Sequence, residues 1–157
     1  MAKVLRSVLV FVFWLIIHPA ANGQSISFED LRRLQLQERR PVIVFIHTTW
    51  CRYCSAMDNS LHNNNALSRL ITQKFYLVKL DGEEKNPIRF AGRDFYFKPT
   101  GNNTGVHDLA TELGTVNGQL SYPTICLLDE NNQITYQYPG FLNAGSLLEL
   151  LSFISGK

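Results

Sequence analysis

The chain has few cysteines and little excess charge. The first argues against a disulfide-stapled scaffold, and the second gives no sign of a nucleic-acid partner. Its 157 residues include three cysteines, an odd number, so at least one thiol stays unpaired and the chain is not a disulfide-stapled scaffold. Lys and Arg total 15 against 13 Asp and Glu, so nothing implies a nucleic-acid partner. The sequence also lacks a glycine-rich dinucleotide fingerprint and a haem-attachment Cys-x-x-Cys-His pattern. We therefore expect no bound cofactor.

No apolar run is long enough to cross a membrane. The longest, Val8 to Ile17, has ten residues, whereas about 20 are needed to span hydrocarbon. Basic Lys3 and Arg6 precede it and small residues surround position 23, which is the pattern of a secretory signal peptide. We predict that residues 1–23 are removed, which leaves a periplasmic or secreted chain, 24–157, without membrane insertion. An uncleaved anchor is the alternative.

The hydrophobic pattern of the remaining chain predicts one α/β domain. The five apolar residues 42–46 are rich in β-branched types and do not alternate with polar residues, which is typical of a strand covered on both faces. We predict helices over 27–39, 50–60, 66–73, 106–113 and around 147–151, and strands over 42–46, 75–80, 124–128 and 133–138.

One stretch does not fit this pattern. Residues 82–105 are polar and glycine-rich, and the stretch is longer than a usual connection inside a compact domain. We interpret it as an insertion. Its aromatic residues Phe95, Tyr96 and Phe97 either lie exposed, where they would contact a partner, or form an extra strand against the sheet.

Two cysteines separated by two residues directly follow the first predicted strand, in Trp50-Cys51-Arg52-Tyr53-Cys54. At the amino end of a helix, both the helix dipole and the adjacent Arg52 favour the thiolate of Cys51, the form that attacks a disulfide. Cys54, one turn further on, is then placed to attack the resulting mixed disulfide. The pattern indicates dithiol–disulfide exchange.

Two other interpretations of the cysteine pair stay open. The pair forms an inert structural disulfide, or it binds zinc. Zinc usually needs four ligands, and only His47 and His62 lie near the pair in sequence, so we predict no metal. We expect Cys126, inside a predicted strand, to be buried and inert, and His47 to be structural.

Over residues 26–156 the chain resembles the thioredoxin superfamily. The resemblance rests on Cys51 and Cys54 after the first central strand, on Tyr122-Pro123-Thr124 before a later one, and on the closing hairpin and helix. The pattern Trp-Cys-x-x-Cys-x-x-Met is most similar to exported bacterial thioredoxin-like proteins. The resemblance implies a thioredoxin fold, a cis peptide before Pro123 next to the dithiol, and a groove for an extended substrate. The expected substrate-binding residues are Trp50, Arg52, Tyr53, Tyr122 and Pro123.

The chain departs from the family at one position. Many thioredoxins carry a buried acidic residue six positions before the first cysteine, where it serves the resolving thiol as a proton shuttle; here that residue is Phe45. Lys79 and Asp81 are possible substitutes, but charges at the end of a strand are usually solvated, and we expect that of both.

The sequence therefore predicts an exported thiol–disulfide oxidoreductase that acts on other exported proteins with disulfides or thiols, in the reducing direction, and exchanges electrons with a redox partner protein. A disulfide oxidase or isomerase is the first alternative, because the same scaffold serves both directions. The second is a non-catalytic binding module that uses residues 82–105 to contact its partner.

Overall fold

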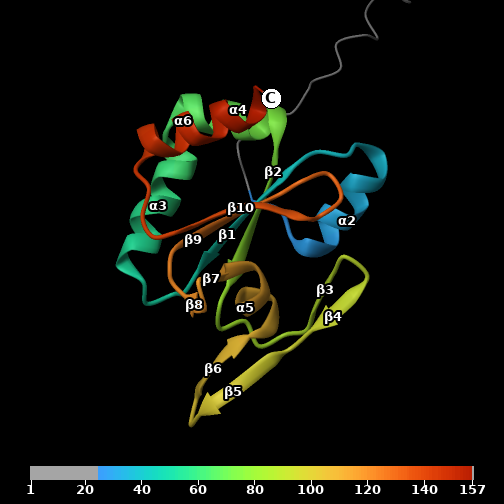
Figure 1. Ribbon diagram of the computed structural model, residues 1–157, viewed down its shortest axis with the longest axis vertical. Helices are drawn as coiled ribbons and strands as arrows, with labels where there is room; N and C mark the ends of the chain where they lie inside the picture. Colours follow the sequence, from blue (N-terminus) through green and yellow to red (C-terminus); the bar gives the residue numbers. More distant parts are fainter. Residues whose placement is uncertain (1–24, 157) are drawn as a thin grey trace, which may run out of the picture.

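A computed structural model describes residues 25–156; the predicted signal peptide and its cleavage site lie outside this range. The central sheet has the strand order β10 (Ile134–Pro139), β9 (Thr124–Leu128), β1 (Val42–His47) and β2 (Tyr76–Asp81) (Figure 1). β1 and β2 run parallel, while β9 is antiparallel to β1 and to β10. This mixed sheet and its helices make the α/β thioredoxin fold, as predicted.

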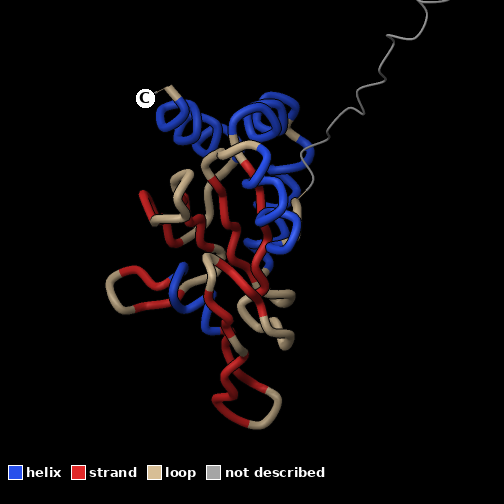
Figure 2. The backbone as a smooth tube through the Cα atoms, turned by 90° about the vertical axis from the view of Figure 1, so that its right-hand side faces the viewer, coloured by secondary structure: helices blue, strands red, loops and turns tan. Residues whose placement is uncertain are grey.

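β1 lies at the centre of the core. Val42, Val44 and Ile46 pack on one face of the sheet, and Ile43 and Phe45 pack on the other. The first face is covered by α2 (Phe28–Gln37) and α5 (Asp108–Gly114), and the second by α3 (Arg52–Asn63), α4 (Asn65–Lys74) and α6 (Ala144–Ser155) (Figure 2). Burial on both faces explains the unbroken apolar run.

Side-chain caps fix where most helices begin. Ser27 Oγ accepts a hydrogen bond from the Asp30 N–H at 3.0 Å, and Asn64 Oδ1 accepts one from the Leu67 N–H at 2.9 Å. Each bond satisfies an N–H group that the first turn leaves without a helical partner. α3 begins at Arg52 rather than at the predicted Trp50, because Cys51 is its N-cap.

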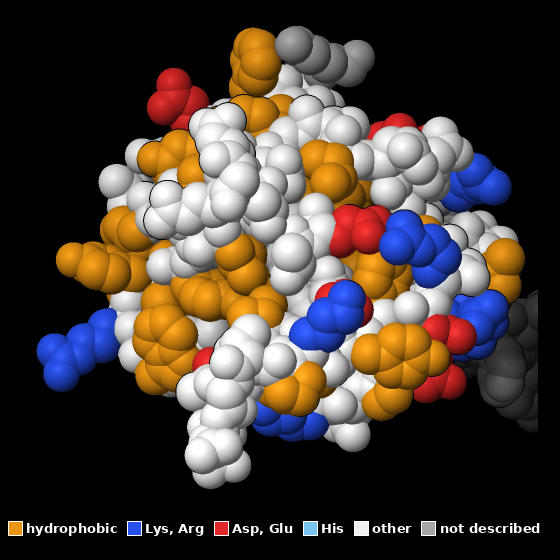
Figure 3. All heavy atoms as spheres, turned by 60° about the horizontal axis from the view of Figure 1, so that its bottom comes forward, with side chains coloured by type: hydrophobic (Ala, Val, Ile, Leu, Met, Phe, Trp, Pro, Cys, Tyr) orange, Lys and Arg blue, Asp and Glu red, His pale blue; other side chains and the backbone are white. Residues whose placement is uncertain are grey.

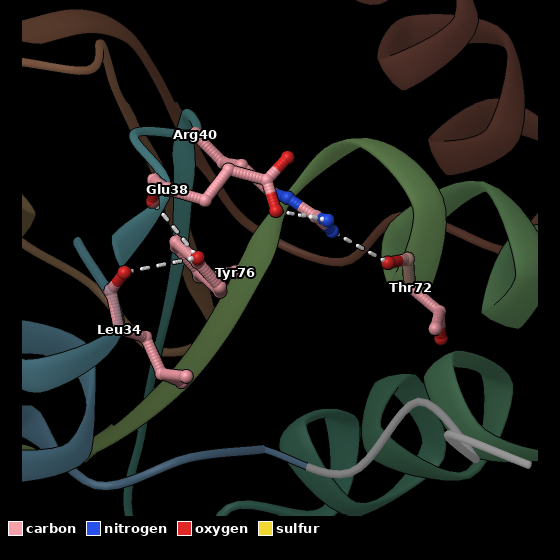
Figure 4. A network of polar contacts seen from close by, with 5 residues as sticks. All are labelled: Leu34, Glu38, Arg40, Thr72 and Tyr76. Atoms are coloured by element: carbon pink, nitrogen blue, oxygen red, sulfur yellow. Dashed lines mark hydrogen bonds and ion pairs between the residues drawn. The ribbon is translucent and has the colours of Figure 1, made fainter. Parts of the chain in front are cut away.

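A polar network joins the end of α2 to β2 and α4 (Figure 4). The Tyr76 hydroxyl donates to the Glu38 carbonyl at 2.9 Å, and the Arg40 guanidinium pairs with the Glu38 carboxylate at 2.6 Å and donates to the Thr72 carbonyl at 3.0 Å. These contacts hold the chain in place immediately before β1, at the end of the sheet opposite the cysteines.

Residues 82–107 form two hairpins, β3 (Ile88–Phe90) with β4 (Arg93–Phe95) and β5 (Phe97–Gly101) with β6 (Thr104–His107). Each is a separate two-stranded sheet, and the second projects from the body (Figures 1 and 2). Of the two alternatives for residues 95–97, the extra strand against the central sheet is therefore wrong. The predicted helix over 106–113 begins only at Asp108, because residues 106 and 107 pair with β5.

One short hairpin was not predicted at all. β7 (Thr115–Val116) and β8 (Gln119–Leu120) pair through a turn in which Asn117 and Gly118 have φ of 52° and 79°. An Asn-Gly pair with two positive φ angles is a common hairpin turn, so the sequence did carry this signal. Within residues 25–156, no helix combines the length and apolar character needed to span a bilayer.

Candidate active site

A disulfide joins Cys51 and Cys54 at the start of α3. β1 ends at His47, and a short loop leads to Cys51, whose Sγ accepts a hydrogen bond from the Cys54 N–H at 3.1 Å. The two cysteines are almost equally covered, with 6 % and 3 % of their surface exposed. The fold thus presents both sulfurs at the amino end of a twelve-residue helix.

Tyr122 and Pro123 directly precede β9. The peptide bond between them is cis. The Tyr122 ring packs against the core cluster that contains both cysteines and meets the Trp50 ring edge to face, with 6.0 Å between ring centroids. Burial raises the pKa of Tyr122 to about 12, so its hydroxyl stays protonated at neutral pH.

Exposed aromatic side chains lie next to the two cysteines in the chain. Trp50 is 65 % exposed and Tyr53 is 68 % exposed, and the Tyr53 ring lies 6.0 Å from that of Phe141. Arg52 is exposed beside them. Figure 3, which looks onto the end where β1 and β2 finish, shows hydrophobic side chains gathered over part of this surface. Phe141 was missed, although it directly follows the predicted break at Pro139-Gly140.

A cleft of about 260 Å³ lies beside Cys54. Its walls come from the end of β1, the loop after it and the first turns of α3, and they include Phe45, His47, Cys54 and Asp58. Phe45 thus does occupy the position where the resemblance implied an acid. Asp58, which was missed in the sequence, supplies a carboxylate from the helix instead.

Asp58 contacts two basic side chains, Lys79 and His62. Lys79 Nζ lies 2.7 Å from Asp58 Oδ2, and His62 Nε2 lies 3.2 Å from Asp58 Oδ1. The expectation that Lys79 is a solvated strand-end charge is therefore wrong. The Asp81 carboxylate accepts a hydrogen bond from the Glu83 N–H at 2.9 Å, so it stabilises the turn after β2.

The remaining candidate residues are structural. Cys126 is fully buried in β9, and burial raises its pKa to about 12, which makes it unreactive in the folded protein. The His47 ring stacks on Phe45. His107, which carried no signal in the sequence, is buried and caps α5 through Nδ1, and burial lowers its pKa. Among residues 25–156, no three His, Cys, Asp or Glu side chains are grouped to hold a metal.

The aromatic residues of the 82–105 segment mostly face inward. Phe95 is buried, and the Phe97 ring is covered by Lys85, whose Nζ lies 3.3 Å from the ring centroid. Tyr96 is 55 % exposed. Of these three aromatics, Tyr96 alone is largely open to solvent, so the alternative of an exposed binding surface holds for one residue.

Comparisons with known proteins agree with this geometry. A family model for a thioredoxin-like domain matches residues 28–155, and the chain therefore belongs to this family. A comparison with curated protein sequences found no match.

Several solved structures share the fold. A thioredoxin-fold protein from Helicobacter pylori is 19 % identical, with a TM-score of 0.59 over 87 % of this chain and 76 % of that one. A DsbH oxidoreductase is 17 % identical, with a TM-score of 0.57 over 85 % of each chain. A disulphide isomerase from Xylella fastidiosa Temecula1 is 17 % identical, with a TM-score of 0.52 over 81 % of this chain and 89 % of that one. Identities this low show the fold alone.

Proposed function

We propose that this protein is an exported thiol–disulfide oxidoreductase that reduces disulfides in other exported proteins. The observation that carries the proposal is the Cys51–Cys54 disulfide at the amino end of α3, next to Tyr122 and an exposed aromatic rim. A disulfide at a helix start can open and close without moving the sheet below it, because both cysteines belong to one helical turn.

The reaction proceeds in two exchanges. In the reduced protein, the Cys51 thiolate attacks one sulfur of a substrate disulfide and forms a mixed disulfide, and the other substrate sulfur leaves as a thiolate that takes a proton from solvent. The Cys54 thiol then loses its proton and attacks Cys51 Sγ, which releases the second substrate thiol and leaves Cys51–Cys54 oxidised. Two electrons pass from the protein to the substrate, and a redox partner protein returns them.

The exposed rim fits a protein substrate. Trp50, Tyr53 and Phe141 offer apolar contact area around the sulfurs, and Arg52 adds a positive charge beside them. In this proposal the backbone of Tyr122, before Pro123, hydrogen-bonds an extended substrate segment. An apolar, partly open surface of this kind suits segments of many sequences.

The reducing direction is supported by the segment between β2 and α5. Residues 82–107 form turns and two hairpins, whereas dedicated oxidases of this fold carry a large helical insertion. A reductase should have a reduction potential near the thioredoxin value of about −270 mV, and an oxidase would lie near about −120 mV. A measured potential above about −150 mV would overturn the reductase assignment.

Export is supported by the sequence of residues 1–23 alone. Expression in a host with a secretory pathway should yield a chain that begins at Gln24, and mass spectrometry of the purified product checks this. A product that keeps residues 1–23 in the membrane fraction would favour the uncleaved anchor.

Substitution of each cysteine tests the activity. The protein should reduce a disulfide-bonded test protein in the presence of a dithiol, Cys51→Ser should abolish this activity, and Cys54→Ser should accumulate mixed disulfides because the resolving attack is lost. Cys126→Ser serves as the matched control and should stay active. Full activity of Cys51→Ser would refute the role of Cys51, and a wild type that reduces the test protein no faster than the dithiol alone would favour the binding-module alternative.

A further inference from the structure

We propose that Asp58 accepts the proton of Cys54 in the resolving step, through solvent in the cleft between them. This role rests on the proposed disulfide exchange and assigns a function to a residue outside the cysteine motif. The resolving thiol needs such a group, because a buried cysteine is a poor nucleophile until it loses its proton.

The geometry places Asp58 on the correct side of Cys54. The two residues are four positions apart on α3, which puts their side chains on the same face of the helix, about 5–6 Å apart at Cβ. Both also line the same cleft, which opens to solvent. Cys54 is only 3 % exposed and otherwise packs among hydrophobic side chains. The cleft is therefore where its thiol meets polar groups.

Two basic side chains keep the Asp58 carboxylate in place. Lys79 approaches from β2 and His62 from the next turn of α3, and His47 lines the cleft from β1. Lys79 Nζ contacts both oxygens of the carboxylate and His62 Nε2 contacts Oδ1, so the carboxylate is held next to the cleft. With Phe45 in the sheet below, Asp58 is the acidic side chain that lines this cleft.

In the mixed disulfide, the Cys54 Sγ–H proton passes through solvent to the Asp58 carboxylate while Cys54 Sγ attacks Cys51 Sγ. The bond between Cys51 and the substrate sulfur breaks, and the substrate leaves as a thiolate. That thiolate takes up one proton from solvent. Asp58 then releases the proton that came from Cys54 to solvent, so the number of protons balances.

Oxidised glutathione is a suitable probe, because the adduct on Cys51 can be followed by acid quench, alkylation and mass spectrometry. Asp58→Asn should lengthen the lifetime of the Cys51–glutathione adduct at pH 7 by at least about tenfold, while the adduct forms within about twofold of the wild-type rate. Asp58→Glu should restore most of the loss. Glu112→Gln, which also removes one ion-paired carboxylate, is the control and should match the wild type.

The pH profile separates a proton acceptor from a structural role. In Asp58→Asn the resolving rate should rise about tenfold per pH unit and approach the wild-type rate above the ordinary pKa of a thiol, about 8.5. The wild-type rate should change less than tenfold between pH 6 and 8, which can be measured even if Asp58→Asn folds poorly. A wild-type rate that rises about a hundredfold over that interval would overturn the role, and so would an Asp58→Asn defect that is equal at every pH.

The two proposals fail differently. If the wild type forms no adduct with glutathione, or if Cys51→Ser consumes glutathione disulfide as fast as the wild type, the proposed function is wrong. If exchange occurs but Asp58→Asn resolves the adduct at the wild-type rate at pH 7, only the role of Asp58 is wrong.

Discussion

Gly82 packs against the Tyr122 ring, and its replacement by alanine tests how closely the two residues are packed. The Gly82 N–H donates to the His47 carbonyl at 2.7 Å, and its carbonyl accepts from the His107 N–H at 2.8 Å. The backbone is thus fixed between the end of β1 and the end of β6. A Cβ atom at this position would lie 2.6 Å from Cε1 and Cζ of the Tyr122 ring and nearer still to its hydroxyl.

The loss of stability expected for Gly82→Ala follows from this lack of space. Gly82 does not require a positive φ, so alanine meets no backbone penalty and the whole effect is steric. Inserting a methyl group into such a packed site costs about 1–3 kcal/mol. For a domain of this size, the midpoint of thermal unfolding should fall by about 3–12 °C. Disulfide exchange should also slow, because the displaced ring leaves its contact with Trp50.

A double-mutant cycle isolates the contact. In a Tyr122→Ala background the ring is absent, so Gly82→Ala should change the free energy of unfolding by less than about 0.5 kcal/mol, and the coupling energy should equal the 1–3 kcal/mol of the single variant. Urea denaturation followed by circular dichroism measures each corner of the cycle. If Gly82→Ala costs the same with and without the Tyr122 ring, the steric explanation is refuted.

Three further predictions concern the thiols and a helix cap. In the reduced protein below neutral pH, alkylation should label Cys51 well before Cys54 or Cys126, as seen by mass spectrometry; equal labelling would contradict activation by the helix start. Because the pKa of Cys126 is about 12 when folded and about 9 when unfolded, only the unfolded chain releases this proton between those values. Its contribution to stability should therefore be lost as pH rises from 9 to 12, by up to about 1.4 kcal/mol per pH unit relative to Cys126→Ala in denaturant titrations. Asn64→Ala should cost about 1 kcal/mol because it removes the cap of α4, whereas exposed Asn65→Ala should change the free energy of unfolding by less than about 0.5 kcal/mol.

The sequence predicted the central part of the fold well, because there the local pattern and the tertiary environment agree. The strand 42–46 is apolar throughout, and it is buried on both faces. The strand 124–128 was predicted with its observed bounds for the same reason. Ser27 and Asn64 cap α2 and α4, because a side-chain oxygen just before an amphipathic stretch can accept from an N–H group of the first turn.

The 82–107 segment was harder to predict, because its hairpins are short and pair only with themselves. Residues 106 and 107 fit a helical pattern with Leu109 and Leu113, but pairing with β5 outweighs that preference. Strand propensity depends on the partner strand, and the partner was not recognised within a polar, glycine-rich stretch. His107 is buried because of the same pairing, so its burial could not be predicted from the residues next to it in the sequence.

The position of Asp58 shows why a motif alone gives an incomplete view of the site. The resemblance directs attention to the strand residue at position 45, whereas the chemistry requires only a carboxylate in the cleft beside Cys54. Helical periodicity places residues 54, 58 and 62 along one face of α3, and this repeat was visible in the sequence. What was not visible is that β2 brings Lys79 to the same point, since that contact spans 21 positions and depends on the register of the parallel strands. A search by helical spacing from the second cysteine would have found the acid, and the fold was needed to find its partner.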